Sequence, residues 1–243
     1  MSESPENARD LKEQVIAITG ASRGIGRAVA LRLATAGARV ALLARSQDAL
    51  EELARKTGGR AVPCDVTDPT SLERARTAVA EWAGREPDAV VAAAGVFSLA
   101  PIDELSDEVL ISNLDVNLKG GILTVRSFLP GLKRRGRGTI VQVGSVAGRR
   151  AFPGNGAYSA SKFGLRGFHE VLLEELRGTG VRATLLEPAA TDTSIWDPMN
   201  PDLDPGLPDR AMMLQPDEVA DAVHFALTRP AGVQIPFLPL ERI

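Results

Sequence analysis

The sequence predicts a single-domain α/β protein with a doubly wound parallel sheet that carries helices on both faces. Short apolar runs alternate with helical patterns along the chain, as expected when parallel strands are buried and joined by helices. The first strand enters a glycine-rich turn that leads into a helix, which is typical of such sheets. The 243 residues suffice for one sizeable core, and no linker divides them.

The first strand–helix–strand unit occupies residues 15–44. A strand at 15–19 breaks into the glycine turn, the helix that follows ends at Gly37, and a second strand covers 40–44. The same alternation predicts the remaining elements in this order: helix 47–56, strand 60–64, helix 69–82, strand 89–93, helix 107–134, strand 138–143, helix 158–177, strand 181–186, helix 216–227 and strand 233–237.

Two segments are expected to depart from regular structure. Residues 1–13 are polar and charged and predict a flexible tail, which leaves 14–243 as the domain. The helix at 107–134 contains a Gly120–Gly121 pair and Pro130, and we expect it to bend near them.

Residues 191–215 interrupt the strand–helix alternation. They are rich in proline but also carry Ile195, Trp196, Met212 and Met213. Long irregular segments beyond the ends of strands often cover ligand sites, so we expect a lid over an apolar substrate pocket. The alternative is an insertion whose apolar residues pack on the body of the protein.

The composition limits the possible functions. The formal net charge is −3 and the charges are mixed along the chain, so we expect no binding to nucleic acid. Cys64 is the only cysteine, and His169 and His224 are the only histidines, so we expect no metal site. No apolar run suggests a secretory signal or a membrane helix, and the protein is therefore expected to be cytoplasmic.

Gly20, Gly24 and Gly26 form the glycine-rich turn. Glycines allow a tight turn and a close approach of the backbone to a pyrophosphate, and the N-terminus of the following helix offers unpaired N–H groups. The preceding strand, the following helix and the next strand are the context that a dinucleotide site requires.

The end of the second strand indicates which dinucleotide binds. An acidic residue there would contact a ribose 2′-hydroxyl, whereas an arginine suits a 2′-phosphate. This chain has Ala44 followed by Arg45, and Arg23 adds a second cation. The pattern favours NADP(H), although NAD(H) stays possible if Arg45 is only a solvated residue.

Tyr158 is the only tyrosine and precedes Lys162 by one helical turn. Side chains at i and i+4 lie on the same face of a helix, so a phenol and an ammonium are expected side by side. A nearby cation stabilises a phenolate and lowers the pKa of the phenol, which suits a tyrosine that exchanges protons.

The segment Thr19–Gly26 together with Tyr158-x-x-x-Lys162 resembles the short-chain dehydrogenase/reductase family, from about Lys12 to the C-terminus. The resemblance implies hydride transfer between a nicotinamide and a carbonyl or secondary alcohol. Tyr158 would donate or accept the proton, and Lys162 would lower its pKa and hold the ribose. Ser145 would fix the substrate oxygen, and Asn117 would anchor a water next to Lys162.

The resemblance also implies a set of cofactor-binding residues. Asp65 and Val66 would contact the adenine, and the Thr191 backbone and the Thr193 hydroxyl would contact the carboxamide and phosphates. One departure is Ala93, because the family usually has asparagine there and the missing amide leaves the local rigidity in doubt. The full set is Gly20, Ser22, Arg23, Gly24, Ile25, Gly26, Arg45, Asp65, Val66, Ala93, Ala94, Gly95, Tyr158, Lys162, Pro188, Thr191 and Thr193.

Other interpretations stay open at this point. The chain could be an NAD-dependent alcohol dehydrogenase of the same family, or a protein that senses nucleotides without catalysis. Family members are commonly homotetramers or dimers, so we expect a homo-oligomer. The contact between copies could use one face of the helix at 158–177, which carries a row of apolar residues: Leu165, Phe168, Leu172 and Leu176. These residues could equally face the sheet.

Overall fold

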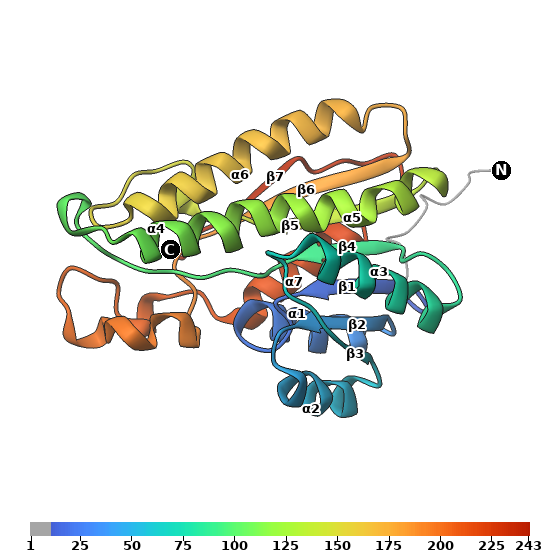
Figure 1. The fold of residues 1–243 in the computed structure, drawn as a ribbon, viewed down its shortest axis with the longest axis horizontal. Helices are drawn as coiled ribbons and strands as arrows, with labels where there is room; N and C mark the ends of the chain where they lie inside the picture. Colours follow the sequence, from blue (N-terminus) through green and yellow to red (C-terminus); the bar gives the residue numbers. More distant parts are fainter. Residues whose placement is uncertain (1–10) are drawn as a thin grey trace.

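The computed structural model describes residues 11–243, whose strands form one parallel sheet (Figure 1). The sheet has the order β3-β2-β1-β4-β5-β6-β7, so the chain starts near the middle and winds outward in both directions. This confirms the predicted doubly wound fold. The strands are β1 (Val15–Thr19), β2 (Arg39–Ala44), β3 (Arg60–Pro63), β4 (Ala89–Ala92), β5 (Gly138–Val143), β6 (Val181–Pro188) and β7 (Phe237–Leu240).

Helices cover both faces of the sheet. Side chains of α1, α2 and α7 join one buried apolar cluster, and side chains of α3, α5 and α6 join another on the opposite face (Figure 1). The two clusters explain why the strands are apolar on both sides. The helices are α1 (Gly24–Thr35), α2 (Gln47–Thr57), α3 (Pro69–Ala83), α4 (Asp107–Asn113), α5 (Gly120–Arg134), α6 (Gly156–Glu175) and α7 (Pro216–Leu227).

The last strand lies further along the chain than predicted. It was expected at 233–237, but β7 spans Phe237–Leu240 and pairs with the end of β6. The buried Arg182 guanidinium donates hydrogen bonds to the carbonyl oxygens of Pro230 (3.1 Å) and Val233 (2.9 Å). These carbonyl oxygens therefore accept hydrogen bonds from a side chain and not from a neighbouring strand, and the segment that contains them forms a turn.

The helix expected at 107–134 is divided by a π-helical segment. Leu114–Lys119 winds with the wider π geometry between α4 and α5, immediately before the glycine pair where a bend was expected. Asn117 lies in the middle of this segment and is buried. Such π segments occur often at functional sites, because they present side chains that a regular helix would turn away.

The start of the domain lies slightly earlier than predicted. Residues 1–10 of the expected tail lie outside the described residues. Leu11 is buried in a core cluster, and the Glu13 amide donates to the Gly37 carbonyl (3.0 Å). Residues 11–13 therefore pack with the fold. Within the described part of the chain, no helix is long and apolar enough to cross a membrane.

Most of the apolar row in and just after α6 packs into the core. Leu172 and Leu176 are each 3% exposed and belong to the buried cluster on this face of the sheet, and Phe168 packs against that cluster. Leu165 is also 3% exposed and lies against Gly121 of α5. These residues therefore contribute to the core rather than to a free contact face. The expected homo-oligomer stays a prediction.

His169 joins α6 to β5 and to the segment that immediately precedes β7. Its Nε2 lies 2.9 Å from the Pro236 carbonyl oxygen, and its Nδ1 lies 2.9 Å from the side-chain amide of Gln142 on β5. Burial lowers the pKa of His169 from 6.5 to about 4, so the ring is neutral at pH 7. A neutral ring has one N–H, which donates to the Pro236 carbonyl oxygen. The other ring nitrogen, Nδ1, is then an acceptor, so the Gln142 side chain must be oriented with its amide N–H toward Nδ1.

We predict that His169 makes stability depend on pH between 6.5 and 4. Unfolded chains protonate histidine in this window and the folded protein does not, so stability falls as the pH falls, by about 3 kcal/mol at most. Urea unfolding across this range should show the slope in the wild-type protein and a smaller one in His169→Gln. Equal slopes in the two proteins would contradict a buried neutral histidine.

Candidate active site

A single large cleft lies where the carboxyl ends of the strands meet. Its volume is about 1100 Å³, and its walls come from the segments that follow β1, β2, β3, β4, β5 and β6. Parallel strands place these ends at one edge of the sheet, and ligands of doubly wound folds bind there. The topology therefore brings together residues that are far apart in the sequence.

The glycine turn closes tightly against the neighbouring strand. A Cβ atom at Gly20, whose φ is +69°, would lie 2.7 Å from backbone atoms of Ala93 and Ala94. A Cβ at Gly26 would lie 2.3 Å from the Gly20 carbonyl oxygen. Helix α1 then begins without an acidic residue in its first turn or a side-chain cap, which leaves its N–H groups and positive dipole end directed to the cleft. This cradle suits a pyrophosphate.

Tyr158 and Lys162 lie in the first two turns of α6 and line the cleft together with Ser145. The Lys162 ammonium donates to the Val143 carbonyl oxygen (2.9 Å) at the end of β5, and lies 5.6 Å from the centroid of the Tyr158 ring. The Ser145 hydroxyl oxygen accepts from the Ala147 amide (3.1 Å). These contacts fix the orientations of all three side chains toward one end of the cleft.

The acid–base properties of the pair differ from the sequence-based expectation. Burial raises the pKa of Tyr158 above its ordinary value, and a hydrogen bond with Ser145 lowers it only in part. Burial also lowers the pKa of Lys162 from 10.5 to about 8. The net effect on the tyrosine is therefore opposite to the lowering expected from the lysine charge. At pH 7 the tyrosine is a neutral phenol that can donate a proton.

Asn117 does not line the cleft, although the resemblance gives it a catalytic role. Its amide accepts from the Val96 N–H (2.8 Å) and donates to the Val96 carbonyl (3.0 Å), and it also donates to the Ser161 hydroxyl (3.1 Å). It thereby joins the loop after β4 to α6. This loop contains Ala93, where the family usually has an asparagine. The contacts of Asn117 therefore hold the loop in place without that side chain.

Aromatic side chains form one wall of the cleft beside the tyrosine. Phe97 contacts both Tyr158 and Trp196 edge to face, with centroid distances of 4.8 Å in each case. Trp196 belongs to the segment predicted as a lid, which also contributes Ile195 and Met212 to the cleft. Met213 was expected there too, but it is fully buried in the body of the protein.

At the other end of the cleft, Arg23 and Arg45 are exposed beside the glycine turn. Asp65 also lines the cleft, and its carboxylate accepts from the Thr67 amide (2.9 Å) and hydroxyl (2.8 Å). The Thr67 amide is the main reason that the pKa of Asp65 is lowered. Asp65 therefore caps the following turn and still faces the cleft, so its structural contact with Thr67 is compatible with the expected contact with a cofactor.

All of the residues predicted to bind a cofactor line this cleft. Their individual roles stay predictions. Other residues of the cleft wall come from loops and from the end of the chain, and no sequence motif identified them. They include Phe97, Arg150, Phe152, Asn155, Glu241 and Arg242. A doubly wound sheet with a glycine turn, a buried serine and lysine and a partly buried tyrosine in one cleft defines a dinucleotide-dependent oxidoreductase.

Comparisons with known proteins agree with this class. Residues 14–204 match the model of the short chain dehydrogenase family. A D-threitol dehydrogenase from Mycolicibacterium smegmatis is 37% identical over 92% of this chain and 89% of that protein. Glycine betaine reductase ATRR from Emericella nidulans is 38% identical over 98% of this chain, which spans only 19% of that protein.

Solved structures give the same result. An alcohol dehydrogenase from Thermococcus sibiricus, complexed with 5-hydroxy-NADP, superimposes with a TM-score of 0.84 at 36% identity, over 96% of this chain and 97% of that one. A serine dehydrogenase complexed with NADP+ superimposes with a TM-score of 0.85 at 29% identity, over 93% and 94% of the two chains. The chain belongs to the short-chain dehydrogenase family and is an oxidoreductase that acts on alcohol or carbonyl groups.

We predict that Gly20→Ala is far more damaging than Gly58→Ala. Both glycines have φ near +70°, so alanine is strained at both, by about 1–2 kcal/mol. Only at Gly20 does the new methyl also meet backbone, whereas nothing lies within 4 Å at Gly58. Thermal unfolding should show an additional loss of about 1–3 kcal/mol for Gly20→Ala, with loss of dinucleotide binding. Equal effects would contradict the close packing of this turn.

Proposed function

We propose that the protein is an NADP(H)-dependent reductase that transfers a hydride between the nicotinamide and a carbonyl or secondary alcohol carbon. The observation that carries this proposal is the position of Ser145, Tyr158 and Lys162 at one end of a cleft whose other end has the glycine turn and Arg45. The cleft therefore has a place for a dinucleotide and, beside it, groups that exchange a proton.

The two exposed arginines support the choice of NADP(H). Arg45 follows the end of β2, where an enzyme selective for NAD(H) has an acidic residue, and Arg23 lies within the glycine turn at the start of α1. Guanidinium groups bind phosphate through paired hydrogen bonds. The complexes with NADP+ and with an NADP analogue in the similar structures support the same choice.

The proton chemistry follows from the state of the buried groups. When bound, the nicotinamide supplies or accepts the hydride. In the direction of reduction, the neutral Tyr158 phenol donates its proton to the carbonyl oxygen of the substrate. Ser145 donates a hydrogen bond to the same oxygen, because its own oxygen is already held by the Ala147 amide. Lys162 is mostly charged at pH 7 and stabilises the phenolate that forms.

Asn117 affects this site indirectly, through the hydrogen bonds of its side-chain amide. Its amide holds the loop that contains Gly95 and Val96 against α6, next to the residues that line the cleft. The π-helical segment directs the amide inward. We infer that Asn117 fixes the nicotinamide end of the cleft. The water that the resemblance places at Asn117 stays a prediction.

The substrate is expected to carry an apolar group next to its carbonyl. Phe97, Trp196 and Phe152 all line the cleft together with Tyr158. Aromatic walls favour flat or bulky apolar groups because they offer a large contact area. The segment 191–215 would close over such a substrate as a lid. Within this segment, Arg210 forms ion pairs with Asp192 (2.6 Å) and Asp197 (2.7 Å), which link its two ends.

We predict that Tyr158→Phe reduces turnover by about 10²–10⁴-fold, because the proton donor is lost. The ring remains and keeps its contact with Phe97, so the affinity for NADPH should stay within about threefold of the wild-type value. Steady-state kinetics with a reducible ketone and NADPH titration measure the two quantities. Substantial turnover in the variant would show that Tyr158 is not the donor.

We predict that Arg45→Asp shifts the preference from NADPH to NADH. Loss of a charged hydrogen bond to the 2′-phosphate, worth about 1.5–3 kcal/mol, should reduce the ratio of the two efficiencies by about 10–100-fold. Arg55→Asp makes the same charge change on α2 at a residue that does not line the cleft, and it serves as the control. An equal shift in both variants would point to a general charge effect and would contradict a direct contact.

A further inference from the structure

A buried carboxylate lies at the junction of the three segments that form the catalytic end of the cleft. Glu187 lies near the end of β6, immediately before Pro188, and its side chain is 3% exposed. A buried carboxylate is unfavourable unless charged or polar partners compensate for the lost hydration. Glu187 has two such partners, and both are arginines.

The two carboxylate oxygens face arginines from different segments. The Oε1 atom accepts from Nη1 of Arg166 (2.5 Å), and the Oε2 atom lies 3.8 Å from Nε of Arg149. Arg166 is one helical turn beyond Lys162 on α6, and its guanidinium also lies over the ring of Phe237 on β7, 4.2 Å from the centroid. The carboxylate therefore holds the catalytic helix against β6.

The second arginine comes from the loop that contains the serine. Arg149 follows the short turn Val146–Gly148, which begins directly after Ser145, and it also forms an ion pair with Glu241. In the same turn, a Cβ atom at Gly148 would lie 2.9 Å from the Lys162 carbonyl oxygen, so the backbone of this turn packs closely against α6. A shift of Arg149 would therefore be transmitted to both Ser145 and Lys162.

We propose that Glu187 is a positioning residue for hydride transfer. By holding Arg166 and Arg149, it fixes the distances among the serine loop, the Tyr158–Lys162 pair and the backbone that continues from Pro188 into the cleft. This inference rests on the proposed function, because the geometry that it maintains is that of the proton donor. It adds a residue that does not line the cleft and that no motif indicates.

The first experiment removes the charge of Glu187. Glu187→Gln keeps the size of the side chain but removes its charge, which weakens the contacts with both arginines. With NADPH and a ketone that the wild-type protein reduces, kcat should fall by about tenfold or more, since displacement of a reacting group by about 1 Å costs up to 10²-fold. KM for the ketone should change much less, because the aromatic wall is untouched. Glu187→Asp keeps the charge and should restore part of kcat.

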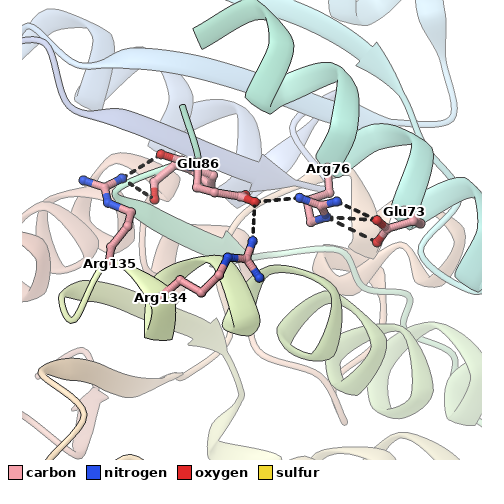
Figure 2. Close-up of polar contacts among 6 residues, drawn as sticks. Glu73, Arg76, Glu86, Arg134 and Arg135 are labelled. Carbon is pink, nitrogen blue, oxygen red and sulfur yellow. Dashed lines mark hydrogen bonds and ion pairs between the residues drawn. The ribbon is translucent and has the colours of Figure 1, made fainter. Parts of the chain in front are cut away.

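A matched control lies at the opposite end of the sheet. Glu86, whose side chain is 19% exposed, also joins two arginines, Arg76 (2.7 Å) and Arg134 (2.8 Å) (Figure 2). Glu86→Gln therefore removes a partly buried carboxylate that also pairs with two arginines, far from the cleft. It should lower the melting temperature as Glu187→Gln does, but leave kcat unchanged. Equal losses of kcat in the two variants, or no loss in either, would overturn the proposal.

A second readout does not depend on the substrate. Tyr158 is the only tyrosine, so the absorbance of its phenolate reports its pKa directly. Burial holds this pKa above 10.0, and a loosened α6 would admit water, so the pKa should fall toward 10.0 in Glu187→Gln and not in Glu86→Gln. Circular dichroism at each pH confirms that the proteins stay folded.

The two readouts separate the proposals. A wild-type protein that transfers no hydride to any carbonyl would contradict the proposed function, while the tyrosine titration would still test Glu187. An unchanged titration would overturn the positioning role. If Glu187→Gln does not fold, Arg149→Gln keeps the closer pair between Glu187 and Arg166 and removes the contact between Glu187 and the serine loop, together with the ion pair between Arg149 and Glu241. It should then lower kcat several-fold with a small change in KM, and an unchanged kcat would overturn the proposal.

Discussion

The parallel direction of the strands is the constraint on which the other features depend. It brings the carboxyl ends of β1 to β6 to one edge, where the loops cannot continue the sheet and leave a cleft between them. Helix α6 crosses this edge, and the hydrogen bond from Lys162 to the Val143 carbonyl joins it to the end of β5. The chemistry of the site follows from that attachment, because it places the lysine and the tyrosine beside the serine loop in a buried environment.

The opposite edge of the sheet has a structural role. There Glu86 lies between Arg76 and Arg134 (Figure 2). Asp88 accepts from the Val15 amide (2.8 Å) and from Arg85 (2.6 Å). Burial alone would raise the pKa of Asp88, but these hydrogen bonds lower it overall, so the carboxylate stays charged. Residues at this edge fix the ends of β1 and β4. Both edges have carboxylates held by arginines, but only the Glu187 group is fully buried and lies next to reacting side chains.

The sequence predicts the fold well, because the strands are buried on both faces and read as continuous apolar runs. The glycine turn and the Tyr158–Lys162 pair were also predictable, because the spacing of residues along the chain is enough to determine their local geometry. Other features depend on tertiary contacts. β7 is displaced because Arg182 binds the carbonyls that precede it, and Phe97 reaches the tyrosine only through the path of its loop. The raised pKa of Tyr158 depends on burial, which no local pattern reports.

The most direct test of this account is a titration of the wild-type protein with NADPH and with NADH, followed by nicotinamide fluorescence and by quenching of Trp196. The account predicts saturable binding of NADPH and weaker binding of NADH, by about tenfold or more if Arg45 contacts the 2′-phosphate. Equal affinities would contradict the role of the arginines. Failure of NADPH to bind would contradict the central claim that this cleft is a dinucleotide site.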